Sequence, residues 1–224
     1  MTMHPLGVAV IADLVGSRKQ PDRALAQRLV VGAFDEVNRD VPAVQPLAPT
    51  VGDESQGLYA TVESAILATL MLRLVLPAPL DLRFGIGVGQ YRTVSGNVSD
   101  VIQDGSAWWA ARAAIVETKK RERRAIPSLR TWYRLDPEHD GWDMTPPPEA
   151  TTNAYLLARD QLVTGMDDRY RKRLLGLMRG ETQDSLARAE GVTQSAISQS
   201  MHRSGAFAVL AGSELFGLRP GADA

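Results

Sequence analysis

The sequence predicts an α/β (α+β) sandwich followed by a small all-α domain. Short apolar, β-branched runs alternate with stretches of helical spacing up to about residue 136. Three successive prolines, Pro146–Pro148, then forbid helix and favour an extended linker. Every segment beyond the prolines has helical spacing. We therefore expect an α/β domain over residues 1–136, a Pro-rich linker over 137–150 and a helical domain over 151–224.

The first part has the element order β-α-β-β-α-β-α-β, which is typical of a ferredoxin-like, mostly antiparallel sheet. The expected strands are short apolar or alternating runs, at residues 6–16, 50–62, 82–94 and 126–135. The second of these should fold back as a hairpin around Asp53–Gly57. Helical spacing marks 21–41, 63–76 and 105–122, and the prolines at 42, 46 and 49 indicate a loop. On the first helix, the expected core contacts are Leu25, Leu29, Phe34 and Val37.

A helix-turn-helix pattern occupies residues 182–205. One helix would end at Glu190, the chain would turn at Gly191, and a second helix would begin at Gln194. The side chains of that second helix that could reach base edges and phosphates of DNA are Gln194, Ser195, Ser198, Gln199 and Arg203. Between residues 169 and 203, seven Lys or Arg stand against three acids, an excess that the net charge of −1 conceals. The alternative is a helical module that contacts another protein.

Two acids could form a metal site. Asp13 ends the first strand and Asp53 lies at the expected hairpin tip, so their carboxylates can lie close together in an antiparallel sheet. Converging carboxylates repel unless a cation lies between them, and Mg²⁺ prefers such oxygen ligands. The alternative, which spacing alone favours, is that both acids serve an ordinary loop and turn.

The strand at 82–94 carries glycines at alternate positions, Gly85, Gly87 and Gly89. Its bare face permits close approach by a helix or by a flat ligand such as a base, and helix packing is the more common cause. Arg112, on the helix that follows, could meet a phosphate or pair with a surface acid. The G-x-G-x-x-G and G-x-S-x-G spacings are absent, which argues against a dinucleotide fold and a serine hydrolase.

Composition excludes further classes. Cysteine is absent, so disulfides and thiolate metal sites are impossible. The apolar runs are too short to span a membrane, and no secretory signal is evident at the N-terminus. We therefore expect a cytoplasmic protein with no membrane partner.

The stretches IADLVGSR, VGDESQGLYA, LRFGIGVGQ and DGSAWWAARAAI, with the helix-turn-helix after them, resemble the SatD family of cytoplasmic bacterial proteins. More distantly, the same order of motifs resembles the class III nucleotide cyclase core and its GGDEF relatives. This resemblance implies two metal ions at Asp13 and Asp53. It also implies nucleotide contacts by Gly52, Asp100 and Arg112.

The chain departs from the cyclase pattern at two positions. Pro49 stands where the cyclases carry a base-selecting Lys, and Ala107 or Trp108 stands at their transition-state Asn. The carboxylates for two-metal chemistry are kept, whereas groups for base reading and charge stabilisation are missing. The resemblance therefore favours nucleotide sensing over turnover.

We expect a one-component transcriptional regulator. Its cyclase-type domain would sense a nucleotide with Mg²⁺, and its helix-turn-helix would bind DNA as a homodimer. One alternative is a divergent nucleotidyl cyclase or nucleotidyltransferase that uses two-metal catalysis on NTPs. Another is a scaffold that contacts only proteins.

Overall fold

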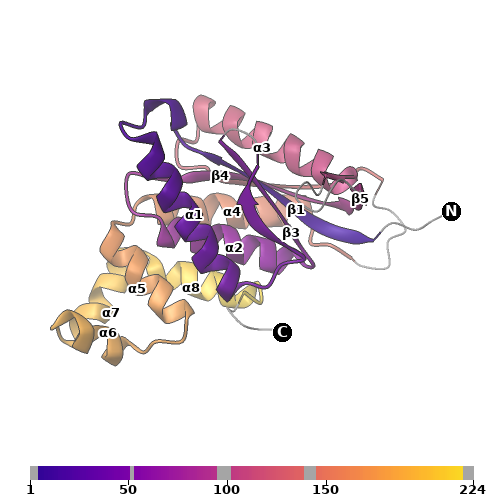
Figure 1. Ribbon diagram of the computed structural model, residues 1–224. Helices are drawn as coiled ribbons and strands as arrows, with labels where there is room; N and C mark the ends of the chain where they lie inside the picture. Colours follow the sequence, from indigo (N-terminus) through magenta and orange to yellow (C-terminus); the bar gives the residue numbers. More distant parts are fainter. Residues whose placement is uncertain (1–4, 51–52, 95–101, 139–144, 219–224) are drawn as a thin grey trace.

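A five-stranded sheet forms the centre of the molecule, with helices on both faces (Figure 1). The computed structural model describes residues 5–50, 53–94, 102–138 and 145–218. The strand order is β2-β3-β1-β4-β7, and the strands are β1 (Leu6–Leu14), β2 (Gln45–Pro49), β3 (Glu54–Tyr59), β4 (Leu82–Gln90) and β7 (Thr131–Leu135). All neighbours pair antiparallel except β4 and β7, which are parallel. The mixed α/β class and the mostly antiparallel sheet are as predicted.

The two faces of the sheet are covered by different helices. Along β1, Val8 and Val10 pack in the core with α1 (Arg23–Asp40) and α2 (Val62–Val75), whereas Ala9 and Ile11 pack against α3 (Ser106–Arg124). This alternation is the two-residue period of a strand buried on both sides. A ribbon of β5 (Arg92–Val94) and β6 (Ile102–Asp104) leads from the sheet into α3.

The glycines of β4 allow α3 to lie directly on the strand. A Cβ at Gly87 would lie 2.1 Å from the backbone nitrogen of Ala111, and one at Gly89 would lie 2.4 Å from that of Ala107. No larger residue fits there without moving the helix. The close approach therefore serves a helix, and the backbone of α3 fills the space that a flat ligand would need.

Two details of the first part differ from the prediction. The hairpin has its first strand at β2, inside the expected loop, because this edge strand tolerates proline. Its turn therefore precedes Glu54, where β3 begins, and Thr50 N donates to Glu54 O at 2.9 Å. On α1, Leu25 and Leu29 are 45% and 39% exposed. The core face of α1 is instead formed by Ala26, Val30, Ala33, Phe34 and Val37.

Five helices follow the prolines and share a core with the sheet. They are α4 (Glu149–Thr164), α5 (Asp168–Met178), α6 (Gln183–Glu190), α7 (Gln194–Arg203) and α8 (Ala206–Leu215). Leu156 of α4 and Ile197 of α7 belong to the same buried cluster as Val8 of β1. A domain boundary at the prolines stays a prediction. Helix α4 contacts β7, and hydrogen bonds of Arg159 and Asp160 join it to α2.

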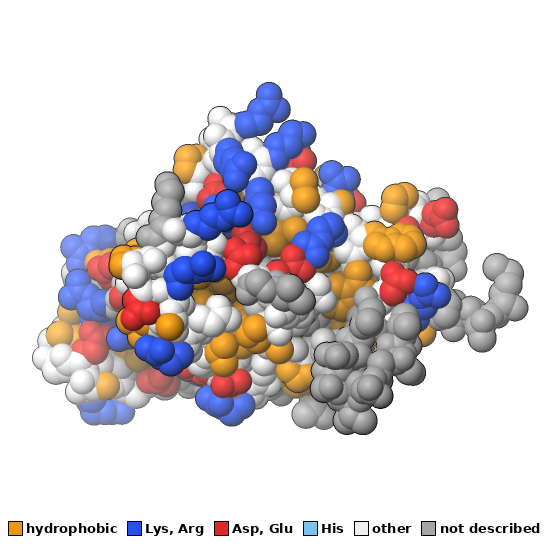
Figure 2. All heavy atoms as spheres, turned by 45° about the horizontal axis from the view of Figure 1, so that its top comes forward, with side chains coloured by type: hydrophobic (Ala, Val, Ile, Leu, Met, Phe, Trp, Pro, Cys, Tyr) orange, Lys and Arg blue, Asp and Glu red, His pale blue; other side chains and the backbone are white. Residues whose placement is uncertain are grey.

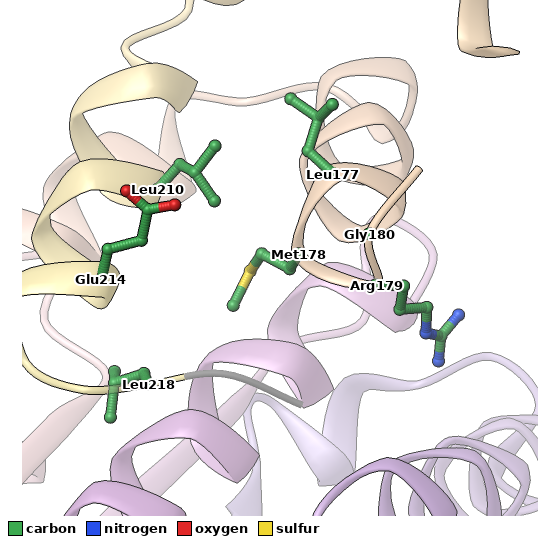
Figure 3. Close-up of a pocket in the computed structure, with 7 residues that line it drawn as sticks. All are labelled: Leu177, Met178, Arg179, Gly180, Leu210, Glu214 and Leu218. Carbon is green, nitrogen blue, oxygen red and sulfur yellow. The ribbon is translucent and has the colours of Figure 1, made fainter. Parts of the chain in front are cut away.

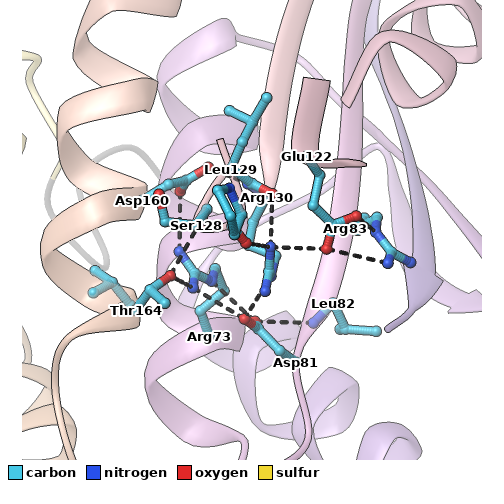
Figure 4. A network of polar contacts seen from close by, with 12 residues as sticks. Arg73, Asp81, Leu82, Arg83, Glu122, Ser128, Leu129, Arg130, Asp160 and Thr164 are labelled. Atoms are coloured by element: carbon cyan, nitrogen blue, oxygen red, sulfur yellow. Dashed lines mark hydrogen bonds and ion pairs between the residues drawn. The ribbon is translucent and has the colours of Figure 1, made fainter. Parts of the chain in front are cut away.

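A buried network of ion pairs fixes α4 to the sheet (Figure 4). Arg73 of α2 donates to Asp81 at 3.0 Å and to Asp160 of α4 at 3.1 Å. Asp160 also accepts from the backbone nitrogens of Arg130 and Thr131 at 2.7 Å. Burial raises the pKa of Asp81, but Arg73 and Arg130 outweigh it and hold that pKa below its usual value.

Among the described helices, none is both long enough and apolar enough to cross a bilayer.

Candidate functional site

Three charged residues that were predicted to bind a metal or a nucleotide lie at one end of the sheet, near the ends of β1 and β3: Asp13, Asp53 and Arg112. Asp13 and Glu54 face each other in the β1–β3 ladder. Asp13 follows the same alternation as Ala9 and Ile11, so its side chain lies on the α3 face of the sheet. Figure 2 shows acidic side chains in the middle of one face of the molecule, with Lys and Arg gathered beside them.

The carboxylate of Asp13 is held by two cations. Asp13 Oδ2 accepts from Arg83 Nη1 at 3.3 Å and lies 3.1 Å from Lys119 Nζ. Arg83 is itself bound by Glu122 of α3 on its other side (Figure 4). The negative charge of Asp13 is therefore compensated by two cations of the chain itself, Arg83 and Lys119.

Asp53 and Glu54 are neighbours in sequence with different partners. Ser17 Oγ donates to Asp53 Oδ2 at 2.6 Å, and this hydrogen bond is the main reason that the pKa of Asp53 is lowered. Arg112 binds both carboxylate oxygens of Glu54. Burial raises the pKa of Glu54, but the hydrogen bonds from Arg112 and Gln56 outweigh burial, so the pKa is lowered on balance.

Lys119 contacts Asp13 directly. Its charge also helps to lower the pKa of both Asp53 and Glu54. Of the two predicted metal ligands, Asp13 is thus paired with an ammonium group and Asp53 lies within the influence of its charge. Arg112 reaches the same place, but it contacts Glu54. Gly52 and Asp100, the other predicted nucleotide contacts, lie outside the described residues.

Motif matching missed four residues of this group: Ser17, Glu54, Arg83 and Lys119. Lys119 follows Arg112 by seven residues, which places both on one face of a helix. That spacing was a usable signal. The pairing of Arg83 with Asp13 has no such signal, because it follows from the register of β1 and β4.

These residues do not fit a divalent cation as they are arranged. Arg83 and Lys119 contact Asp13, Arg112 binds Glu54, and Asp53 accepts a hydrogen bond from Ser17, so each carboxylate already has a partner from the chain. Within the described ranges, no three or more His, Cys, Asp or Glu side chains are placed to hold a metal. Two unit charges 4 Å apart interact by about 4 kcal/mol near a protein surface, and a divalent ion beside Lys119 would meet about twice that repulsion. Mg²⁺ at this site stays a prediction that requires Lys119 to move.

A cleft of about 410 Å³ opens near the hairpin tip. Its lining residues are Leu14, Ser17, Gln20, Arg23, Ala24, Gln27, Pro49, Thr50 and Asp53. The first turns of α1 provide Arg23 and Gln27, so the cleft combines one guanidinium with amide and hydroxyl groups. Such groups can bind a phosphate or a sugar. Another hollow, between α5 and α8, is lined mainly by apolar side chains such as Met178 and Leu210, and we assign it no role (Figure 3).

The helix-turn-helix prediction falls on α6 and α7. Gly191 makes the turn with φ of 66°, and Thr193 caps α7 by accepting from Ala196 N at 3.1 Å. Ala187 of α6 and Ile197 of α7 are buried, whereas Val192 between the two helices is exposed. Arg173 of α5 binds Glu190 and Ser200, which ties the end of α6 to α7.

The predicted DNA contacts lie on the outer side of α7. Gln194, Ser195, Gln199 and Arg203 are exposed, and Ser198 is partly buried. The local positive charge is smaller at the surface than in the sequence. Arg171 and Arg173 are buried, and Arg179 is bound by Glu36 and Asp40 of α1.

The fold and the site define an α/β protein with a charged sheet end and an appended helical part. The sequence model of the SatD family matches residues 7–124, more than half of the chain, and this chain belongs to the SatD family. That match covers the sheet up to β4 together with α3, and ends before β7 and the helices that follow. No curated protein matches the chain.

Solved structures with similar folds include nucleotide cyclases. A bacterial light-regulated adenylyl cyclase is 12% identical, with a TM-score of 0.43, over 58% of this chain and 76% of that one. A second structure described in the same way is 14% identical, with a TM-score of 0.40, over 59% and 44% of the two chains. The guanylyl cyclase Cya2 is 11% identical, with a TM-score of 0.38, over 49% and 69%.

Proposed function

We propose that this SatD-family protein is a DNA-binding regulator that reads DNA with α7. The observation that carries the proposal is the division of α7 into two faces. Ile197 and Met201 are buried against neighbouring helices, while Gln194, Gln199 and Arg203 are exposed. A helix with one anchored face and one polar outer face can enter the major groove without unfolding its own core.

The exposed side chains suit the task chemically. Gln can form paired hydrogen bonds with adenine, and Arg can do so with guanine or contact a phosphate. Gln194 Nε2 donates to Gln183 Oε1 at 2.8 Å, which orients it at the start of α7. Arg203, at the far end of α7, is well placed for the phosphate backbone. Gln194 and Gln199 would then carry base reading, and Arg203 would carry affinity.

Fluorescence anisotropy with duplex DNA at several salt concentrations tests this proposal. Non-specific binding is expected at a Kd of about 10⁻⁴–10⁻⁶ M at physiological salt, with tighter binding to an operator. Arg203→Ala should weaken binding to all sequences and reduce the salt slope by about one. Gln199→Ala should instead weaken the preference for the operator. Arg123→Ala, on the exposed end of α3, is the matched control and should change neither. If neither Arg203→Ala nor Gln199→Ala changes DNA binding, the proposal that α7 contacts DNA is wrong.

We further propose that the N-terminal part binds a nucleotide, with its phosphates at the cleft between α1 and the hairpin tip. The supporting observation is that Ser17, Arg23 and Thr50 line one cleft beside Asp53. Arg112 would join the site only by exchanging Glu54 for a phosphate, because Glu54 now occupies its guanidinium.

A thermal-shift panel tests the nucleotide. ATP, GTP and cyclic mono- and dinucleotides would each be added with and without Mg²⁺. A ligand at about 100 times its Kd adds about 2.7 kcal/mol. For a chain of this size that raises Tm by about 5–10 °C. Arg23→Ala should reduce the shift, and Arg28→Ala on the same helix serves as the control. No shift with any nucleotide would remove this second proposal and leave DNA binding standing.

A homodimer would present two copies of α7 to a two-fold operator, and light scattering with and without DNA tests that assembly. No contact among the described residues favours the nucleotidyl cyclase or nucleotidyltransferase alternative over binding alone. Conversion of an NTP during prolonged incubation, detected by mass spectrometry, would restore it.

A further inference from the structure

Lys119 holds an unusual position for a lysine on the surface of a helix. Its Nζ lies 3.1 Å from Asp13 Oδ2, and its charge also acts on Asp53 and Glu54. A position among several carboxylates at the end of two strands is one that a divalent cation commonly occupies. We propose that the Lys119 ammonium takes the place of a divalent cation here and keeps Mg²⁺ and Mn²⁺ away from Asp13 and Asp53.

The geometry around Asp13 separates an inner cation from an outer one. Arg83 has a side chain only 15% exposed and is held from behind by Glu122, so it is a fixed part of the sheet. Lys119 has a side chain 40% exposed and stands on the solvent side. A hydrated metal ion that approaches Asp13 from solvent therefore meets Lys119 first.

Two factors together exclude Mg²⁺: the positive charge of Lys119 repels the ion, and the carboxylate oxygens that would bind it already have partners. Mg²⁺ releases its bound water reluctantly and needs carboxylates that are free to replace that water. Asp13 Oδ2 is already shared by two cations, and Asp53 Oδ2 accepts the hydroxyl of Ser17 at 2.6 Å. The metal would have to displace the ammonium and compete with the hydroxyl in one step. Because Lys119 is part of the chain, its ammonium stays beside Asp13, whereas a metal ion would have to bind from solution.

This inference does not rest on DNA binding or on nucleotide binding by the protein. It does change what any phosphate ligand would meet at this end of the sheet. Such a ligand would meet the exposed Lys119 ammonium, whereas Arg112 would contact it only after releasing Glu54.

The test uses Mn²⁺ alone as the probe, with the full-length protein. Free Mn²⁺ gives a strong electron paramagnetic resonance signal that falls when the ion binds. The wild-type protein should show no saturable loss of signal in the millimolar range. Lys119→Met should bind Mn²⁺ at least about tenfold more tightly than the wild-type protein, because it removes the outer of the two cations on Asp13 and leaves only Arg83 there. Lys119→Arg keeps the charge and should still exclude Mn²⁺.

Matched variants assign the effect to the carboxylate pair. Lys120→Met, one residue further along α3 and paired only loosely with Glu117 at 3.7 Å, should behave as wild type. Adding Asp13→Asn to Lys119→Met should abolish the gained site. Circular dichroism checks folding, and Lys119→Gln replaces Lys119→Met if the latter is unfolded. Saturable Mn²⁺ binding by the wild-type protein that is lost in Asp13→Asn would overturn the proposal, as would a folded Lys119→Met or Lys119→Gln that gains none.

Discussion

Arg73 is the most informative single position for the stability of the whole molecule. Its side chain is fully buried, and it holds Asp81 and Asp160 together while also donating to Thr164 Oγ1 at 2.9 Å. Arg73→Met keeps much of the apolar stem and removes the charge. Both carboxylates are then left in the interior with one cation fewer. Removing one partner of a buried ion pair costs about 3–5 kcal/mol, and we expect the upper end because Arg73 serves two acids.

Urea unfolding followed by circular dichroism measures this loss of unfolding free energy. In a thermal melt, at about 2–4 °C per kcal/mol for a chain of this length, Tm should fall by about 6–20 °C. Lys120→Met removes an exposed cation from the same molecule and should change stability by less than about 1 kcal/mol. Adding Asp81→Asn to Arg73→Met should recover part of the loss, since it removes one uncompensated charge.

The pH dependence gives a second, independent readout. In the wild-type protein the pKa of Asp81 is held below its usual value, because Arg73 and Arg130 outweigh burial. Its ionised form therefore contributes stability above the unfolded pKa, and this contribution is lost as the pH falls through the folded pKa. Without Arg73, only Arg130 still opposes the effect of burial, so the pKa of Asp81 rises relative to the wild-type protein and its protonation costs the folded state less. The stability deficit of Arg73→Met should therefore shrink as the pH is lowered. A deficit below about 1 kcal/mol, or one that does not change with pH, would refute this account.

Three further variants test other parts of the structure. Gly87→Ala should lower Tm strongly, because its Cβ would lie 2.1 Å from Ala111 N; an unchanged Tm would contradict the close packing of α3. Gly32→Ala is the matched control on α1, where nothing lies within 4 Å, and it should stabilise by about 0.5–1 kcal/mol. Arg173→Met should weaken DNA binding by the folded protein, because Arg173 joins Glu190 of α6 to Ser200 of α7. A loss of DNA affinity that is no larger in free energy than the loss of unfolding free energy would show a purely structural role.

The sequence predicted where helices and strands occur better than it predicted how they pack against one another. The continuous apolar run at residues 6–14 and the caps of α6 and α7 are local signals, so β1 and the two helices could be predicted from short windows. The strand β2 was missed because its prolines resemble a loop, and only its place at the sheet edge makes them acceptable. Leu25 and Leu29 were assigned to the core because spacing gives the apolar stripe but not which side of it faces inward.

The candidate site shows the same limit. Asp13 and Asp53 could be found because acids at strand ends and hairpin tips stand out from apolar surroundings. Their compensating cations could not, since Arg83 reaches Asp13 only through the β1–β4 register and Lys119 through the packing of α3. A charge pattern in sequence therefore located the carboxylates but not the cations Arg83 and Lys119 that contact Asp13 in the folded chain.

The glycines of β4 and the carboxylate of Asp13 look unrelated in sequence, but the structure connects them through α3. Because Gly85, Gly87 and Gly89 have no side chains, the backbone of α3 contacts β4 directly. A helix held further away by larger residues would move its outward face from the neighbouring strands by a comparable distance. Lys119 Nζ, now 3.1 Å from Asp13, would then stand too far away for a direct ion pair. The glycines thus set the distance of α3 from the sheet, and the ion pair between Lys119 and Asp13 depends on them.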